Sequence, residues 1–195
     1  MPVFVKICGL ATPGADSAAI GHGADMLGFR FVNDADLTPE KAAALVAAVP
    51  SGMDRVGVFA EPGDAWIGAV VAQAPLDLIQ LDGDEAPARV RDIQQTFKLP
   101  VIKTVRDLAM AKTYDGMADW LLFDMDEGRA GLRGIRLKRP WLLGGALDNL
   151  HGGEGADTFT LAGAIVGWRT GSFSHRAAVA KRTRLKRDGV TSSMI

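Results

Sequence analysis

Short apolar segments alternate with helix-like segments along the chain, and this alternation constrains the fold more than any other feature. The expected strands cover residues 3–8, 26–31, 55–59, 76–81, 100–105, 119–124, 141–144 and 161–168. A strand-then-helix order predicts a parallel sheet covered by helices. Eight such units favour a closed barrel, because no G-x-G-x-x-G follows the first strand and the chain has no P-loop.

The expected helices are less even than the strands. They cover residues 15–22, 40–49, 63–74, 84–97, 107–114 and 174–187. Thr38 is the predicted N-cap of the second, with Pro39 at its first position. Residues 128–139 read as a Gly/Arg-rich loop, and the glycines between His151 and Gly155 weaken a helix expected over 148–160.

Length and composition fit one domain. The chain has 195 residues, 48% hydrophobic and 23% charged, enough for a sizeable core. We therefore expect residues 1–195 to form a single α/β domain, a (β/α)8 TIM barrel of near-minimal length. Neither a linker nor a low-complexity segment divides it.

Charge and cysteine content restrict the partners. The net charge is −1, so whole-molecule charge does not favour binding to a polyanion such as a nucleic acid. The tail is basic, with Arg182, Arg184, Lys186 and Arg187 on the last helix, and we interpret this as a solvated face rather than a nucleic-acid site. One cysteine allows no internal disulfide, and we see no signal peptide or membrane span, so we expect a cytoplasmic protein.

Cys8, the only cysteine, closes the first predicted strand just before Gly9. Alternation places Lys6 and Cys8 on one face of that strand. In a parallel barrel Cys8 then stands at the carboxyl-terminal mouth, where barrel enzymes carry their chemistry. Cysteine at a strand end is usually a small buried hydrophobe; a thiolate that acts as a base is the functional alternative.

Asp124 closes the sixth predicted strand, after Trp120-Leu121-Leu122-Phe123. A carboxyl at the end of an apolar strand is expected to be partly desolvated, which favours its protonated form and makes it a possible proton donor. Capping of the following turn is an equally good explanation.

Glycines follow the last three predicted strands. Backbone N–H groups at glycines approach anions easily, and barrels often bind phosphate beyond strands seven and eight. Gly-rich loops are also common without a ligand. The candidate phosphate-binding residues are Gly128, Gly131, Gly144, Gly145, Thr170 and Gly171.

Further polar residues lie on the predicted strands. Arg30 ends the second strand, and Gln80 and Asp82 lie at the end of the fourth. For Lys6 and Lys103 a paired polar layer inside the barrel is the favoured interpretation. The three histidines, at positions 22, 151 and 175, lack ligand spacing, so we predict no metal.

Several motifs together resemble one family, phosphoribosylanthranilate isomerase of tryptophan biosynthesis. They follow the family's order and spacing over residues 3–150. The motifs are Lys6-Ile7-Cys8-Gly9-Leu10, Gly23-Ala24-Asp25-Met26-Leu27-Gly28-Phe29, Val56-Gly57-Val58-Phe59, Ile79-Gln80-Leu81-Asp82-Gly83-Asp84-Glu85, Val101-Ile102-Lys103, Tyr114-Asp115-Gly116-Met117-Ala118-Asp119 and Leu143-Gly144-Gly145.

The resemblance implies a fold, a reaction and two catalytic residues. Members are cofactor-free (β/α)8 barrels that convert N-(5-phosphoribosyl)anthranilate, a small phosphorylated substrate, by an Amadori rearrangement. The matching residues are Cys8 as general base and Asp124 as general acid. We expect a monomer or a homodimer.

The sequence also departs from the family. The family's Arg after strand two is absent from the shortened loop at 33–37, and we hypothesise that Arg30 holds the substrate carboxylate instead. Asp82 stands where the family has His. The family's Asp-Val-Ser-Ser-Gly-Val-Glu at strand eight is matched only by Gly167-Trp168-Arg169-Thr170-Gly171-Ser172-Phe173.

Two other functions stay open for this sequence. One is a barrel without this activity that binds a small phosphorylated ligand or serves a partner. The other is a different phosphosugar isomerase or epimerase. The altered binding loops favour these alternatives, and the retained Cys8 and Asp124 oppose them.

Overall fold

The first five predicted strand–helix units form as expected in the computed structural model, which describes residues 3–32, 37–124, 141–144 and 164–168. The strands are β1 Val3–Cys8, β2 Met26–Arg30, β3 Asp54–Phe59, β4 Leu78–Leu81, β5 Val101–Val105, β6 Trp120–Asp124, β7 Trp141–Gly144 and β8 Ala164–Trp168. The helices are α1 Pro13–Gly21, α2 Pro39–Ala47, α3 Asp64–Gln73, α4 Pro87–Phe97 and α5 Leu108–Tyr114.

Local sequence determines where several of these helices start. Thr12 and Thr38 accept hydrogen bonds from Ala15 N and Lys41 N, and a proline follows each threonine in the first turn, as expected for α2. Helix α4 starts at Pro87, later than predicted. Proline suits a first helical position because it has no N–H to satisfy, and residues 82–86 are left to the loop after β4.

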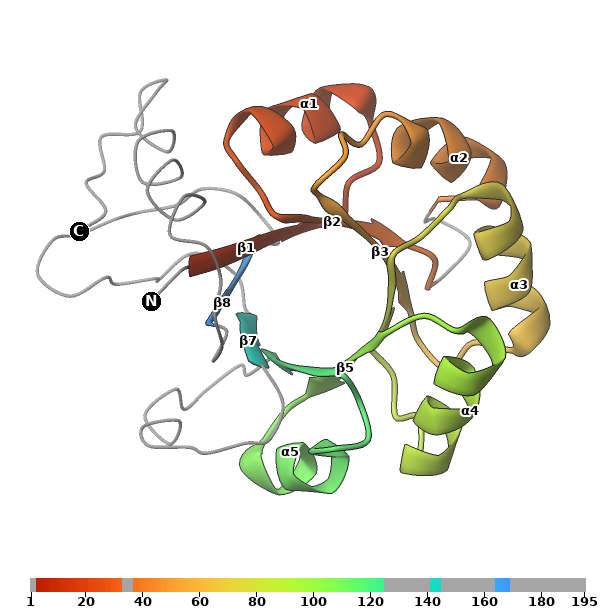
Figure 1. Ribbon diagram of the computed structural model, residues 1–195, viewed down its shortest axis with the longest axis vertical. Helices are drawn as coiled ribbons and strands as arrows, with labels where there is room; N and C mark the ends of the chain where they lie inside the picture. Colours follow the sequence, from red (N-terminus) through yellow and green to blue (C-terminus); the bar gives the residue numbers. More distant parts are fainter. Residues whose placement is uncertain (1–2, 33–36, 125–140, 145–163, 169–195) are drawn as a thin grey trace, which may run out of the picture.

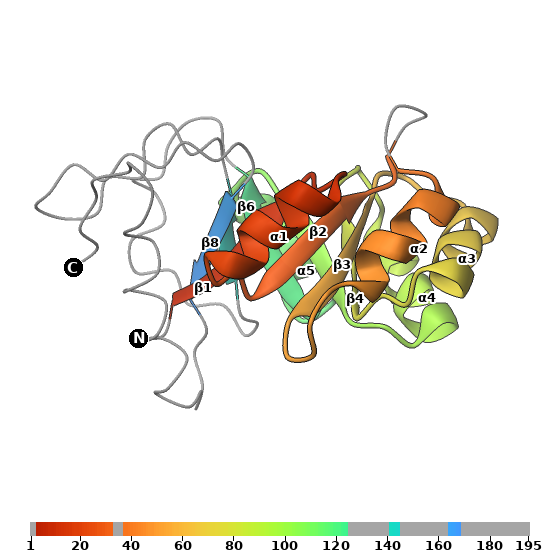
Figure 2. The same ribbon diagram turned by 90° about the horizontal axis from the view of Figure 1, so that it is seen from above.

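The strands pair in chain order around a ring. β1 to β7 are parallel neighbours, and β8 pairs with both β7 and β1, which closes the ring. Figure 1 shows α1 to α5 on the outside of this ring, and Figure 2 shows the same helices along its outer face. The parallel α/β architecture is therefore confirmed for the first six strands and their helices.

The eighth strand differs from the prediction. β8 runs antiparallel to β1 and to β7, so Trp168 pairs with Val3 at the start of β1, and Ala164 pairs with Ile7. An apolar run predicts a strand but carries no information about its direction, which was inferred from the strand–helix alternation alone. The helices expected over 148–160 and 174–187 lie outside the described residues, and the complete (β/α)8 barrel is not established.

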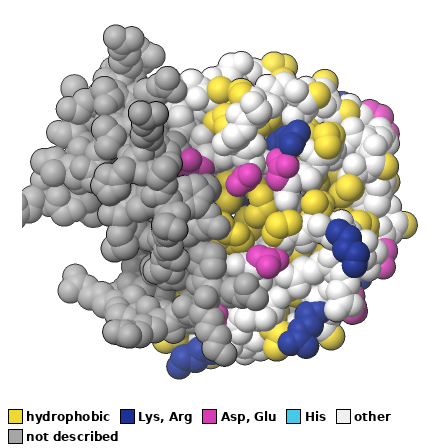
Figure 3. Space-filling model, in the orientation of Figure 1, with side chains coloured by type: hydrophobic (Ala, Val, Ile, Leu, Met, Phe, Trp, Pro, Cys, Tyr) yellow, Lys and Arg dark blue, Asp and Glu magenta, His cyan; other side chains and the backbone are white. Residues whose placement is uncertain are grey.

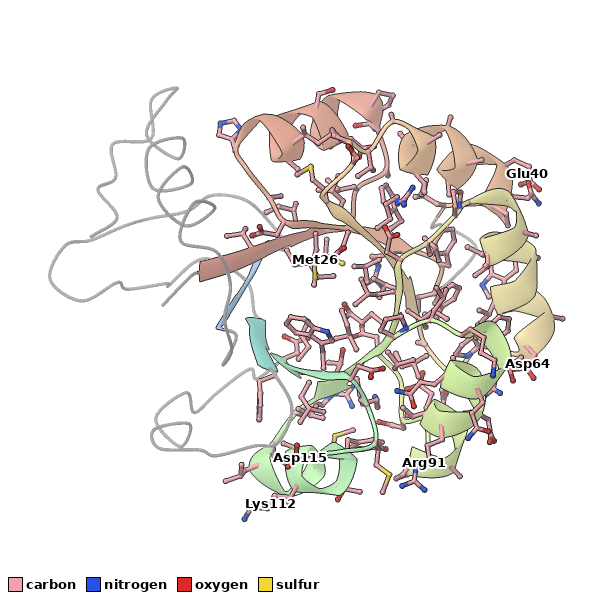
Figure 4. All side chains as sticks on the ribbon, in the orientation of Figure 1. Met26, Glu40, Asp64, Arg91, Lys112 and Asp115 are labelled. Atoms are coloured by element: carbon pink, nitrogen blue, oxygen red, sulfur yellow. The ribbon has the colours of Figure 1, made fainter. Side chains whose placement is uncertain are left out.

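Two hydrophobic clusters lie on the two faces of the described sheet. Inward-facing residues form one cluster, Met26, Val56, Leu78, Ile102, Trp120 and Leu122. Met26 points into the middle of the ring in Figure 4. A larger cluster packs the outer faces of the strands against the helices, with Leu27, Phe29 and Ile79 fully buried within it.

Figure 3 shows acidic side chains around a hydrophobic centre on the visible face.

Three aspartates repeat one contact at the amino-terminal ends of the strands. Asp25 N donates to Val5 O at 2.7 Å, and Val5 N donates to Asp25 Oδ2 at 2.8 Å. The pairs Asp77–Arg55 and Asp119–Val101 make the same two bonds, each between 2.8 and 2.9 Å. These three aspartate clamps fix the register of β1–β2, β3–β4 and β5–β6, because a one-residue slip would break both bonds.

Candidate active site

Cys8 and Asp124 are the last residues of β1 and β6. Since β1 to β6 are parallel, both residues lie at the same carboxyl-terminal end of the sheet. Cys8 is partly exposed. Asp124 is exposed, so the desolvation expected for it is not found: the apolar part of β6 ends at Phe123, one residue earlier.

Gly144 is the one predicted phosphate-binding glycine within the described residues. It is the last residue of β7 and pairs with Asp124 in the parallel register. This places a glycine backbone beside the candidate acid, at the edge where barrels bind phosphate. The other predicted phosphate-binding residues, Gly128, Gly131, Gly145, Thr170 and Gly171, lie outside the described part of the chain.

Arg30 ends β2, next to β1 in the ring. By alternation its side chain shares the inward face of Met26 and Gly28, and it is partly buried. The position brings a guanidinium to the same end of the barrel as Cys8, as the sequence predicted.

A polar network crosses the ends of β4 and β5. The buried Gln80 amide donates to Thr104 Oγ1 at 3.3 Å and to Asp82 Oδ1 at 3.4 Å. Its own oxygen, Gln80 Oε1, is buried without a hydrogen-bond partner among the described residues. A buried carbonyl oxygen without a donor is costly, so this atom weakens the network rather than completing it.

Lys103 is buried and paired, as predicted, but it is not inside the barrel. Ile102 beside it belongs to the inward-facing cluster, so by alternation Lys103 lies on the helix-covered face of β5. Its Nζ lies 3.2 Å from Glu85 Oε2, and both side chains are almost completely buried. The ammonium also donates to Gly83 O at 2.6 Å and to Leu81 O at 3.2 Å. Burial lowers the pKa of Lys103, and the charge of Glu85 acts in the opposite direction.

Glu85 extends this pair to the neighbouring loop. Its Oε1 accepts from Glu61 N at 2.7 Å, just after β3, and Tyr114 OH donates to Glu85 O at 2.6 Å. The Lys103–Glu85 pair thus holds the loops after β3 and β4 against β5 and α5, which fixes one side of the mouth.

Lys6 does not follow the same prediction. Its side chain is 0% exposed, yet Nζ has no hydrogen-bond partner among the described residues. A Cβ built on Gly28 would lie 2.8 Å from Lys6 Nζ and 2.9 Å from Cys8 Sγ. The structure therefore brings the ammonium and the thiol together over a position that has no side chain.

The comparisons with known proteins agree with the motif pattern. The family model "N-(5'phosphoribosyl)anthranilate (PRA) isomerase" matches residues 5–165. The chain belongs to the PRA isomerase family. An N-(5'-phosphoribosyl)anthranilate isomerase of Paracoccus denitrificans is 39% identical in an alignment 174 positions long, which covers 77% of this chain and 81% of that protein.

Solved members of the PRA isomerase family have a similar fold. TrpF from Jonesia denitrificans superposes with a TM-score of 0.63 at 27% identity, covering 73% of this chain and 74% of that one. A phosphoribosyl anthranilate isomerase in complex with reduced 1-(o-carboxyphenylamino)-1-deoxyribulose 5-phosphate gives 0.57 at 28% identity. That match covers 63% of this chain and 64% of the other, slightly under two thirds of its length.

Some features of this family member were not accessible to sequence reasoning. The environment of Lys6 and the unpaired oxygen of Gln80 depend on contacts between strands, which no local pattern encodes. The aspartate clamps had a visible signal in the sequence, because Asp25, Asp77 and Asp119 each stand immediately before the first residue of an apolar strand. No helix among the described residues is long and apolar enough to cross a membrane.

Proposed function

We propose that this chain is an N-(5-phosphoribosyl)anthranilate isomerase that performs an Amadori rearrangement, with Cys8 as general base and Asp124 as general acid. The observation that carries the proposal is the family match over residues 5–165. The position of both residues at one end of a parallel sheet supports it. We include in the proposal that the chain forms the (β/α)8 barrel of the family. The position of β8 between β7 and β1 in the ring supports this part of the proposal.

The mechanism needs two proton transfers by enzyme side chains and a final tautomerisation, in which C1 gains a proton and the C2 hydroxyl loses one, so the composition does not change. Asp124 donates a proton to the ribose ring oxygen, the C1–O bond breaks, and the anthranilate nitrogen forms a Schiff base with C1. The Cys8 thiolate then removes the proton from C2, which gives an enolamine. Tautomerisation of the enolamine gives the ketone at C2. General acid and general base steps of this kind each contribute about 10²- to 10⁴-fold to the rate.

The surrounding residues have matching binding roles in this proposal. Arg30 holds the substrate carboxylate, and the backbone around Gly144 faces the phosphate together with the glycines predicted in the neighbouring loops. Each assignment follows from the charge or hydrogen-bonding capacity that the residue brings to the carboxyl-terminal end.

The test is isomerisation by the purified chain. The ketone product and the aldose substrate are separated by chromatography, and a new carbonyl carbon is detected by NMR. The variants C8S and D124N are each expected to lower kcat by about 100-fold or more, because each removes one proton-transfer group. Lys112→Met, on the exposed face of α5, is the matched control and keeps wild-type kcat. Wild-type kcat in C8S would remove Cys8 from the mechanism.

One observation favours a second candidate, a barrel that binds a phosphorylated ligand without this activity. Trp168 at the end of β8 pairs with Val3, at the opposite end of β1 from Cys8. A phosphate loop directly after strand eight would need the reverse direction. Binding of inorganic phosphate without conversion of the aldose, measured on the wild-type chain, would support this candidate over the isomerase.

A further inference from the structure

Lys6 and Cys8 converge on Gly28. They occupy one face of β1 two residues apart, and Cys8 pairs with Gly28 on β2. Lys6 Nζ and Cys8 Sγ lie 2.8 Å and 2.9 Å from the point where a Cβ on Gly28 would be. By the sum of these two distances, nitrogen and sulfur are at most about 5.7 Å apart.

The Lys6 ammonium is buried without a hydrogen-bond partner in the described part of the chain. Its side chain is 0% exposed. An isolated buried charge is strongly unfavourable unless an opposite charge lies nearby. Across the Gly28 position it meets the thiol of Cys8, a side chain that can become an anion.

We propose that Lys6 is a positioning residue whose ammonium stabilises Cys8 as a thiolate at the mouth of the barrel. An opposite charge within about 4 to 6 Å favours the charged form of an ionisable group. The thiolate, and not the thiol, is the form that can remove a proton. The inference rests on the proposed function only in so far as that function gives the thiolate its role as base.

Gly28 makes this arrangement possible. A side chain there would meet Lys6 Nζ, Cys8 Sγ and, at 3.2 Å, the backbone Cα of Cys8. The flexible lysine could move away, but the Cα cannot do so without bending β1. The absence of a Cβ at position 28 therefore leaves the ammonium and the sulfur in one shared space.

The test uses alkylation of Cys8, the only cysteine in the chain, so that every alkylated thiol is this one. Iodoacetate is an anion and iodoacetamide is neutral, and the two reagents separate local charge from simple access. Lys6→Met is expected to slow alkylation at pH 7 about fivefold with iodoacetamide and about tenfold with iodoacetate. Lys6→Arg restores the preference for iodoacetate. A purely structural role for Lys6 would leave the ratio of the two rates unchanged.

Lys112→Met is the matched control, since it removes an exposed lysine and the same net charge, and both rates should equal those of the wild type. Rates in Lys6→Met within twofold of the wild type would overturn the proposal. If Lys6→Met does not fold by circular dichroism, the wild type decides. Its iodoacetate-to-iodoacetamide ratio must exceed that of N-acetylcysteine amide, and an equal or lower ratio overturns the proposal.

This experiment is independent of the proposed isomerase activity, because alkylation needs no substrate. A charge effect at Cys8 in a chain that does not isomerise the aldose would refute the function and keep the Lys6–Cys8 pair. Isomerisation with no charge effect would do the reverse. In an active enzyme, Lys6→Met lowers kcat and leaves KM nearly unchanged, since Lys6 acts through Cys8.

Discussion

Lys6 and Lys103 are both fully buried, but their surroundings are opposite. Lys103 has the carboxylate of Glu85 and two backbone carbonyls as partners, whereas Lys6 has no hydrogen-bond partner among the described residues. A paired buried charge holds neighbouring loops in place. A buried charge without partners adds nothing of this kind, and for Lys6 we propose that its use is to stabilise the Cys8 thiolate. The contrast is then between a lysine that maintains the structure and one that acts on the site.

The largest effect is expected for Lys103→Met. Removing one partner of a buried ion pair leaves Glu85 as an uncompensated buried charge, at a cost of about 3 to 5 kcal/mol. Urea unfolding followed by circular dichroism measures the free energy of unfolding. The double variant Lys103→Met/Glu85→Gln should recover part of the loss, because the stranded charge is gone. A loss below about 1 kcal/mol for the single variant would break the comparison.

Asp16 extends the comparison to a carboxylate. It lies in the first turn of α1, is 3% exposed, and neither side-chain oxygen has a hydrogen-bond partner among the described residues. Burial raises the pKa of Asp16 above its ordinary value of 3.8. The ionised carboxylate therefore costs stability at neutral pH, and Asp16→Asn is expected to raise the free energy of unfolding at pH 7 by about 1 kcal/mol.

The pH dependence of this gain has a defined sign. Because the folded-state pKa lies above the unfolded one, the penalty is absent below pH 3.8 and grows as the pH rises through the folded-state pKa. The advantage of Asp16→Asn over the wild type should therefore vanish in urea titrations at pH 3 and be complete at pH 7. An advantage that is equal at both pH values would show that the Asp16 charge is not its cause.

The smallest effect on stability is expected for Lys6→Met. Methionine fills a similar volume without a charge to bury, so the free energy of unfolding should change by less than about 1 kcal/mol or rise slightly. The same urea titration measures it beside Lys103→Met. A loss as large as that of Lys103→Met would show that Lys6 has a structural partner after all, and the difference between the two lysines would disappear.

The sequence predicted the parts of the fold that depend on local chemistry. Thr38 and Pro39 start α2, and the apolar runs up to Phe123 form strands where the alternation placed them. Strand direction is not encoded in an apolar run, so the prediction of β8 was correct in position but wrong in direction. The site followed the same division. Strand ends located Cys8 and Asp124, whereas the exposure of Asp124 and the pairing state of Lys6 depend on neighbours far apart in the chain.

The aspartate clamps also bear on the order in which the barrel assembles. Each joins two residues that are only 18 to 22 positions apart in the chain. The entropy lost in closing the segment between them is therefore small. We thus expect three local β-α-β modules to form before the ring closes. Pulsed hydrogen exchange should find the amides of Val5, Arg55 and Val101 protected early in refolding, ahead of contacts between modules.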